Sequence, residues 1–322
     1  MTEKVDSIVS YMNTGKKRAL EIFESIDFEK IIEHPNILVS ANFWEPERYQ
    51  AARVCYRVMR QIDDLIDNHK AEHKAIAPHE KEQFVEDVEK WLKLFLSAGR
   101  HDPAHAALVE TIERFRIPLW PLEDFARAMI YDINHDGFDT LQTYLDYSRG
   151  ASVAPASIFV HLSGLRSNGN GYQLPLFDVR DTATPCAIFS YLVHIMRDFQ
   201  KDHHNNLNYF AGDMMAKHGL TVAGLRKMAF GEPLSDGFRN MMAEYMALAD
   251  RYRSETIQVM ERVCPLLESP YRLSLEIIFN LYLMVFERID PMNGSFTTAE
   301  LVPTPADTKA RVRHVIEAFP FD

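Results

Sequence analysis

The chain has 322 residues, a length that allows one large domain or two small ones around a sizeable buried core. Hydrophobic residues make up 47% of the chain and charged residues 25%, which is an ordinary globular composition. The formal net charge of −11 argues against duplex nucleic acid as a partner, because DNA binding requires an excess of basic side chains.

Nothing in the sequence predicts export or membrane insertion. The three cysteines, an odd and sparse count without metal-ligand spacing, are typical of reduced thiols in a cytosolic protein. Residues 1–20 carry basic side chains but no apolar segment of the kind found in signal peptides. No stretch approaches the roughly 20 apolar residues that a membrane-spanning helix requires. We expect a cytoplasmic protein, with peripheral membrane contact only if its substrate or product is oily.

Helical periodicity recurs along almost the whole chain, and no convincing series of alternating strands is present. The expected helices span residues 6–32, 46–68, 80–98, 103–116, 121–136, 140–163, 185–204, 212–218, 221–229, 234–263, 269–289 and 305–318. Pro185 is interpreted as a first-turn residue, a position that suits proline. The longest loop, residues 164–184, suits an exposed connection better than a domain linker. The sequence therefore predicts an all-α fold in which residues 1–322 form a single domain.

The helix expected at 46–68 carries an unusual polar stripe. Residues at steps of four, three and four share one helix face, and here they are Tyr56, Arg60, Asp63 and Asp67. An ordinary amphipathic helix places apolar residues on its inward stripe, and burying unpaired carboxylates is costly. The stripe is therefore either a solvated surface, on which Arg60 pairs with Asp63 or Asp64, or part of a site.

The helix expected at 185–204 repeats this pattern. It is mostly apolar, and its polar exceptions His194, Asp198 and Asp202 again step by four residues. Two occurrences of one unusual pattern are more specific than one. Mg²⁺ held by a few carboxylates usually completes its shell with water and phosphate oxygens. Two such helices facing inward would form a diphosphate site, in which metal ions supply the positive charge.

These motifs resemble those of the squalene/phytoene synthase family, the head-to-head (1′–1) prenyl-diphosphate condensing enzymes. The first stripe is similar to the family's R-x-x-D-D-x-x-D helix, and Arg197 to Asp202 is similar to its R-D-x-x-x-D helix. Between them, Asp132 and Tyr147 resemble the aspartate and tyrosine of the family's central segment. Tyr209 begins an aromatic pair that matches the family's pair after the second motif. The resemblance extends from about residue 43 to residue 282.

The resemblance implies an isoprenoid-synthase-type helical bundle around a central cavity, and a prenyltransferase. It implies that Mg²⁺ ions clamp a prenyl diphosphate on four catalytic aspartates: Asp63, Asp67, Asp198 and Asp202. Tyr147 is a further catalytic candidate, because a group near the cation must accept a proton; released diphosphate is the alternative acceptor. The implied substrate-binding residues are Arg60, Tyr56, Asp132, His194, Arg197, Tyr209 and Tyr282, of which Arg60 would contact diphosphate oxygens directly.

The implied reaction joins two farnesyl or two geranylgeranyl diphosphates through a cyclopropyl diphosphate intermediate. The product would be a phytoene-type triene, or squalene if NADPH supplies a hydride, although the sequence contains no Gly-rich nucleotide fingerprint after a strand. One alternative is an enzyme that ionises a single prenyl diphosphate and then cyclises, hydrolyses or transfers it. A second alternative is a non-catalytic helical assembly factor, which would have no need for four caged aspartates.

The chain departs from the family pattern on its second acidic helix. Tyr191 replaces the usual glutamine, and His194 replaces the asparagine expected one turn before Asp198. His194 is either a ligand, a diphosphate donor or proton acceptor, or a partly buried histidine bonded to a neighbour. If His194 donates to diphosphate, we expect nearby carboxylates to favour its charged form, with a pH dependence of activity between roughly pH 6 and 8.

Further departures lie on either side of this helix. Leu207 occupies the position of a basic residue, for which His203 or His204 would have to compensate. Pro155 interrupts the small-residue segment and is expected to kink its helix beside the cavity.

Two histidine pairs have the i,i+4 spacing of zinc ligands, namely His69 with His73 and His101 with His105. Both pairs lack further ligands nearby and are expected to be solvated.

Overall fold

The computed structural model describes residues 2–33, 36–73, 75–96, 103–169 and 171–321, and almost all of its regular structure is helical. The all-α prediction is confirmed. In chain order the elements are α1 (Thr2–Ser25), η1 (Phe28–Glu33), α2 (Asn36–Ala41), α3 (Pro46–His73), α4 (Pro78–Leu96), α5 (Pro103–Phe115), α6 (Trp120–Asn134), α7 (Leu141–Ser148), η2 (Arg149–Val153), α8 (Ala154–Gly164), β1 (Arg166–Ser167), β2 (Tyr172–Gln173), α9 (Val179–Arg197), α10 (Phe199–His204), α11 (Gly212–Lys217), α12 (Val222–Ala229), α13 (Asp236–Val263), η3 (Cys264–Leu266), α14 (Ser269–Phe286), α15 (Thr298–Leu301) and α16 (Pro305–Ala318).

The helix expected at 185–204 differs most from the prediction. It begins at Val179, because the side chain of Asp178 accepts a hydrogen bond from the backbone N–H of Asp181 and caps the first turn. Pro185 is therefore an interior residue of α9, and its assignment to the first turn is wrong. The helix breaks at Asp198, which separates α9 from α10 with φ −91° and ψ 7°.

The helix expected at 140–163 is divided into α7, the single π-helical turn η2, and α8. The turn closes with a hydrogen bond from the Ala154 N–H to the Arg149 carbonyl, five residues back. Pro155 follows directly, in the first turn of α8, so the predicted kink takes the form of a widened turn. Gly150 is required here, because a Cβ atom would lie 2.3 Å from the carbonyl oxygen of Asp124 on α6.

Several short elements were not predicted, namely α2, the β1–β2 pair, η3 and α15. Residues 36–41 form α2, which packs against α14, and the expected loop contains the antiparallel β1–β2 pair. A two-residue strand carries too little alternation to be recognised from sequence.

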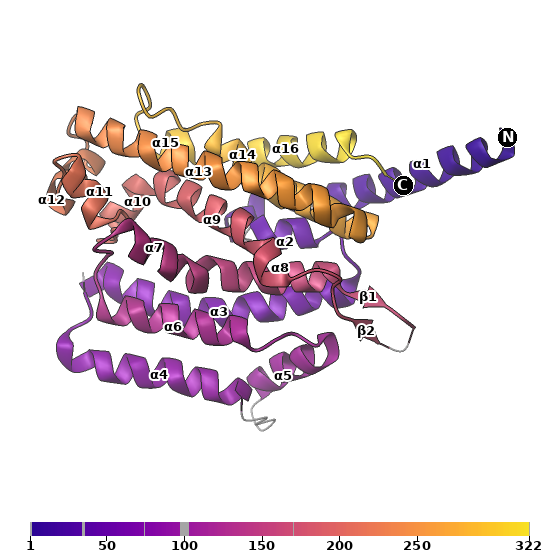
Figure 1. Cartoon of the computed structure of the whole chain (residues 1–322), viewed down its shortest axis with the longest axis horizontal. Coiled ribbons are helices and arrows are strands. Elements are labelled where there is room, and N and C mark those ends of the chain that lie inside the picture. Colours follow the sequence, from indigo (N-terminus) through magenta and orange to yellow (C-terminus); the bar gives the residue numbers. More distant parts are fainter. Residues whose placement is uncertain (1, 34–35, 74, 97–102, 170, 322) are drawn as a thin grey trace.

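The central helix α9 positions the rest of the bundle. It packs against α13 on one side and against η2 and α8 on the other, while α6 and α4 pack together farther out (Figure 1). A large buried cluster joins these helices, and a smaller one packs the end of α1 against α14 and α16.

Arg48 ties the start of α3 to the end of α8. Its side chain is 2% exposed, and its Nε lies 2.6 Å from a carboxylate oxygen of Glu45. Its Nη1 donates to the backbone carbonyls of Leu162 and Leu165, both at 2.9 Å. The guanidinium also lies 4.2 Å from the ring centroid of Tyr271 on α14. A buried charge is tolerated here because the Glu45 carboxylate balances it and two backbone carbonyls accept hydrogen bonds from Nη1.

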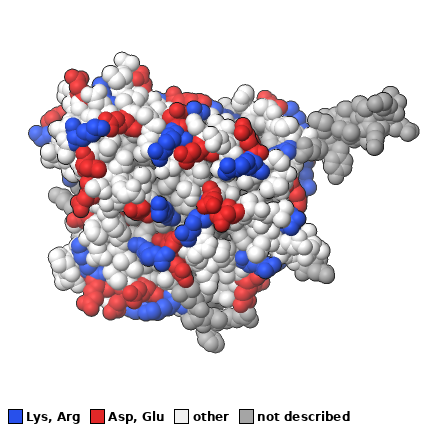
Figure 2. All heavy atoms as spheres, in the orientation of Figure 1, with Lys and Arg blue, Asp and Glu red and all other residues white. Residues whose placement is uncertain are grey.

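Acidic and basic side chains are interspersed over the face shown in Figure 2. Several are helix-surface pairs such as Lys90 with Glu86, which contribute little to stability individually. Among the described residues, no helix is both long enough and apolar enough to cross a membrane.

Candidate active site

A cavity of about 540 Å³ runs through the middle of the bundle, between α3, α8, α9, α10, α13 and α14. This volume is in the range of small-molecule sites. Ten of the twelve residues singled out from the sequence line it: Tyr56, Arg60, Asp63, Asp67, Tyr147, His194, Asp198, Asp202, Tyr209 and Tyr282. The other two, Asp132 and Arg197, do not line it but contact residues that do.

The cavity has a polar end and an apolar end. The aspartates lie at the polar end with Lys201 and Asn205. The apolar part is lined from α2, α3, α8, α13 and α14 by Ile37, Met59, Phe159, Val160, Val259, Met260, Val263, Leu275 and Ile278. A smaller apolar void of about 30 Å³ adjoins it behind Met59 and Phe159.

The polar stripe of α3 has features of both a solvated surface and a binding site. Arg60 pairs with Asp63 and with Asp64, as a solvated stripe would. Asp63 nevertheless lines the cavity, whereas Asp64, whose side chain is 44% exposed, does not. The pKa of Asp63 is raised to about 7, mainly by burial. The charge of Asp67 adds to this shift, and Arg60 opposes it. The pKa of Asp67 is also raised, mainly by burial.

Asp202 on α10 belongs to the same electrostatic group as Asp67 on α3. Burial raises the pKa of Asp202 to about 8, and the negative charges of Asp198 and Asp67 contribute to this shift. Lys201 lowers the pKa of both Asp67 and Asp202, so it lies within reach of both acidic stripes. The Asp202 N–H bonds to the Asp198 carbonyl at 2.8 Å, which preserves the helical relation between them across the break.

Asp198 differs from the other three aspartates because its hydrogen-bonding partners outweigh the effect of burial on its pKa. The Arg197 guanidinium donates to both of its carboxylate oxygens, at 2.7 and 2.8 Å, and His194 Nε2 lies 3.0 Å from Oδ2. Burial opposes ionisation of Asp198, but these hydrogen bonds and charges hold its pKa well below the usual range. Arg197 therefore contacts Asp198 rather than projecting into the cavity.

His194 is neutral near pH 7. Burial lowers its pKa, the charge of Arg197 lowers it further, and the opposing effect of Asp198 does not outweigh them. The expectation that carboxylates keep His194 charged is therefore wrong. Its side chain is 42% exposed, but that surface faces the cavity rather than bulk water.

The four aspartates suit Mg²⁺ by their chemistry. They are hard oxygen donors, and the pKa values of three of them are raised, chiefly by burial and further by neighbouring carboxylates. Within the part of the chain that the structure describes, no three His, Cys, Asp or Glu side chains are grouped closely enough to hold an ion by themselves. Ions here would take further ligands from water and substrate phosphates, as Mg²⁺ commonly does.

Tyr147 belongs to a buried polar chain behind the cavity wall. Its hydroxyl donates to Asp132 Oδ2, and Lys70 Nζ lies 3.9 Å from Asp132 Oδ1. Lys70 also donates to the His135 carbonyl at 2.9 Å. Burial raises the pKa of Asp132 to about 6, while Lys70 and Tyr147 lower it. Tyr147 therefore stays a neutral phenol, with its pKa raised by burial and by Asp132.

The match to known proteins agrees with this site. The model of the family described as squalene/phytoene synthase matches residues 34–306, which is most of the chain. The chain belongs to the squalene/phytoene synthase family. Phytoene synthase 2 of Solanum lycopersicum is 25% identical over 264 residues, which cover 81% of this chain and 79% of that protein. Phytoene synthase of Narcissus pseudonarcissus is 29% identical over 201 residues, which cover 61% of this chain and only 44% of that protein.

Two solved structures share the fold of this chain. A dehydrosqualene synthase in complex with ligand superposes with a TM-score of 0.65 at 14% identity, covering 96% of this chain and 99% of that chain. YisP from Bacillus subtilis superposes with a TM-score of 0.60 at 13% identity, covering 93% and 98% of the two chains. At these identities the likeness establishes the fold, and the family membership makes this a prenyltransferase-type chain.

Residues at which the chain departs from the family pattern line the cavity, whereas the histidines expected to compensate for Leu207 do not. Tyr191, His194 and Leu207 line the cavity. His203 does not: it is buried against Phe199.

His204 does not line the cavity either, and its Nε2 lies 3.2 Å from the carbonyl of Ala229. Lys201, which sequence reasoning missed, is a basic side chain that lines the cavity in addition to Arg60. Its position between Asp198 and Asp202 in the motif was the signal that could have identified it.

The zinc hypotheses gain no support from the structure. The rings of His69 and His73 are stacked with centroids 4.4 Å apart, and His69 Nε2 lies 3.5 Å from Glu80. His101 and the side chain of His105 lie outside the described residues.

Proposed function

We propose that the chain catalyses head-to-head condensation of two prenyl diphosphates. The observation that carries the proposal is one cavity whose lining combines the aspartates of both stripes with many apolar side chains. Diphosphates would bind at the polar end, and the isoprenoid chains would occupy the apolar part. A protein of net charge −11 would bind anionic diphosphates in this arrangement if metal ions supplied the local positive charge.

Asp63, Asp67 and Asp202 would hold Mg²⁺ through their poorly compensated carboxylates. Bound Mg²⁺ would neutralise the charge that develops on the leaving diphosphate. Asp198 would bind Mg²⁺ only while its carboxylate oxygens also contact Arg197 and His194. Its role would therefore include holding those two side chains in place. Arg60 would contact diphosphate directly when it exchanges one of its aspartate partners for phosphate oxygens.

The remaining side chains would orient the substrates and exclude water. Ionisation breaks the allylic C–O bond, and the double bond of the second substrate attacks the resulting cation. Loss of a proton closes a cyclopropyl ring. Tyr147 is one candidate acceptor, since it lines the cavity and could pass its hydroxyl proton to the Asp132 carboxylate as its oxygen takes the substrate proton; released diphosphate is the other. A second ionisation would give the triene, or squalene if NADPH is used.

The test is incubation with farnesyl or geranylgeranyl diphosphate, with and without Mg²⁺ and NADPH, followed by mass spectrometry of the lipid extract. The expected product contains two prenyl units, requires Mg²⁺ and is accompanied by pyrophosphate. A monomeric prenyl alcohol or cyclic product would support the single-substrate alternative. Absence of turnover with both substrates would refute the proposal.

We also propose that residues 1–322 fold as one domain, since one buried cluster extends from α2 to α15. A single cooperative transition in thermal unfolding is expected. Two separated transitions would contradict it.

A further inference from the structure

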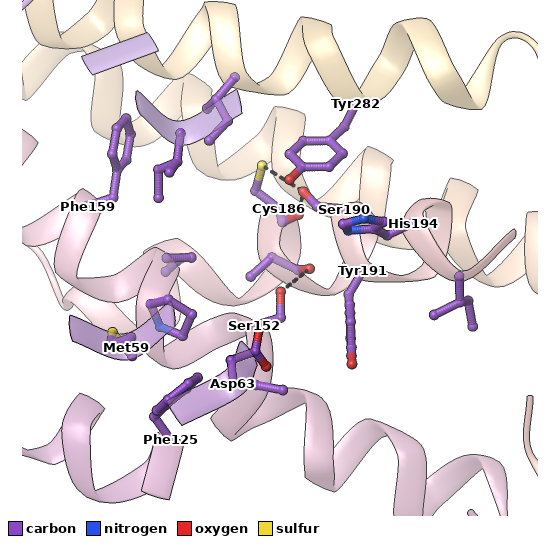
Figure 3. A pocket seen from close by; sticks show the side chains of 18 of the residues that line it. Met59, Asp63, Phe125, Ser152, Phe159, Cys186, Ser190, Tyr191, His194 and Tyr282 are labelled. Carbon is purple, nitrogen blue, oxygen red and sulfur yellow. Dashed lines mark hydrogen bonds between the residues drawn. The ribbon is translucent and has the colours of Figure 1, made fainter. Parts of the chain in front are cut away.

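Tyr191 lines the cavity but has no part in the diphosphate site proposed above. It leaves α9 one turn before His194, from the same side of the helix. Its side chain extends toward the side of the cavity where Asp63 lies, whereas His194 lies nearer Tyr282 (Figure 3). Tyr191 therefore borders the side of the cavity that carries Asp63.

The ring of Tyr191 is held in place from behind. It stacks nearly parallel on Tyr144 of α7, with 5.5 Å between centroids and 14° between planes. Tyr144 is completely buried and does not line the cavity. Stacking on one face fixes the ring plane, and the rest of the ring borders the cavity.

Two more tyrosine rings complete an aromatic wall at this point. The ring centroid of Tyr191 lies 6.3 Å from that of Tyr147 and 6.4 Å from that of Tyr209, and all three residues line the cavity. The nearby charges of Asp132 and Asp63 oppose ionisation of Tyr191, whose pKa is raised well above its ordinary value, chiefly by burial. The wall consists of neutral, electron-rich rings beside carboxylates. Such an environment stabilises a carbocation, and it contains no phenolate that could attack the carbocation.

We propose that the ring of Tyr191 is a further catalytic group that stabilises the allylic carbocation through its π face. This inference rests on the proposed function. When the C–O bond of the donor breaks, its electron pair leaves with the diphosphate oxygen and the positive charge stays on the allylic carbons. Cation–π attraction in a desolvated site is strong enough to lower that barrier measurably. Because the charge exists only after ionisation has begun, the ring raises kcat and leaves KM nearly unchanged.

The test varies the electron density of the ring at constant shape. Tyr191→Phe is compared with variants that carry phenylalanines with one, two and three ring fluorines at position 191. The turnover of the full-length protein is measured with Mg²⁺ and prenyl diphosphate, by pyrophosphate release and product mass spectrometry. The same series at Tyr144 is the matched control, because that ring supports Tyr191 without bordering the cavity.

We expect Tyr191→Phe to stay within about twofold of the wild type, and kcat to fall stepwise with fluorine number. The total fall should be about 5- to 30-fold, with KM unchanged within about twofold. The Tyr144 series should be flat. A flat series at position 191, or a loss confined to Tyr191→Phe, would overturn the inference while wild-type turnover upholds the proposed function. Absence of wild-type turnover would refute both.

Discussion

Asp198 and Asp202 occur in one motif, yet replacing each by asparagine should change stability in opposite directions. Asp198 is paired with the Arg197 guanidinium, contacts the neutral His194 and has a lowered pKa, whereas the pKa of Asp202 is raised to about 8 by burial and neighbouring carboxylates. In metal-free protein at pH 8, Asp202→Asn removes an unfavourable charge and should stabilise the fold. Asp198→Asn leaves the largely buried Arg197 without its carboxylate and should destabilise it.

The magnitudes follow from the linkage between protonation and folding. A shift of about four pKa units in Asp202 corresponds to at most about 5 kcal/mol, which solvent screening and relaxation reduce to about 1–2 kcal/mol. For 322 residues the unfolding entropy is about 0.7 kcal/mol/K, so Asp202→Asn should raise Tm by about 1.5–3 °C. Loss of the partner of a buried arginine costs about 3 kcal/mol, so Asp198→Asn should lower Tm by about 4 °C.

The pH dependence distinguishes the two effects. The carboxyl of Asp202 ionises near pH 4 in the unfolded chain and near pH 8 in the native protein, so its cost to stability develops between these values. The gain from Asp202→Asn should therefore vanish near pH 4. The contribution of Asp198, whose native pKa is lowered, is fully present above pH 4 and disappears only as the pH falls below the unfolded value. The deficit of Asp198→Asn should thus persist at pH 5.

The assay is differential scanning fluorimetry in EDTA at pH 5 and pH 8, repeated with Mg²⁺ and pyrophosphate. Ligand binding should stabilise the wild type by about 2.7 kcal/mol at a hundredfold excess over Kd, and Asp202→Asn by less. The reasoning fails if both variants shift Tm in the same direction at pH 8, or if the Asp202→Asn gain is independent of pH.

Four further outcomes are expected. Asp63→Ala should abolish prenyl diphosphate turnover and keep cooperative unfolding; activity at the wild-type level would exclude its role in binding Mg²⁺. His194→Asn should stay active, and since native His194 is neutral near pH 7, its pH–rate profile between pH 5 and 8 should depart from the wild type only on the acid side. Arg48→Met should lower the free energy of unfolding in urea by about 3–5 kcal/mol, and a loss below about 1 kcal/mol would show that the buried contacts of Arg48 are dispensable. Phe159→Ala should join the cavity to the adjoining void, cost about 3–5 kcal/mol, and raise kcat/KM for geranylgeranyl relative to farnesyl diphosphate; an unchanged ratio would mean that Phe159 does not limit chain length.

The sequence alone determined the fold class, and ten of the twelve residues singled out from it line the cavity. Helical periodicity depends on local spacing, so the all-α architecture follows from it without tertiary information. The two aspartate stripes were likewise visible, because an i,i+4 carboxylate pair on an apolar helix conflicts with ordinary patterning. That conflict at Asp63 and Asp67 pointed to a site.

Local spacing did not predict the places where tertiary contacts override it. Local spacing did not contain the break at Asp198, the π turn before Pro155 or the two-residue β1–β2 pair. The close approach of Gly150 to α6 is such a contact, and no spacing rule contains it.

Only the tertiary structure decided the electrostatic character of each site residue. Asp198 and Asp202 have the same local pattern, but Arg197 and His194 contact one of them while like charges surround the other. His194 lost its expected charge for a similar reason, since burial and Arg197 outweigh the adjacent carboxylate. Tyr191 became a candidate only when its ring was seen to stack on Tyr144 and border the cavity. A pKa or a ring orientation depends on everything within a few ångströms, and the sequence does not state which residues those are.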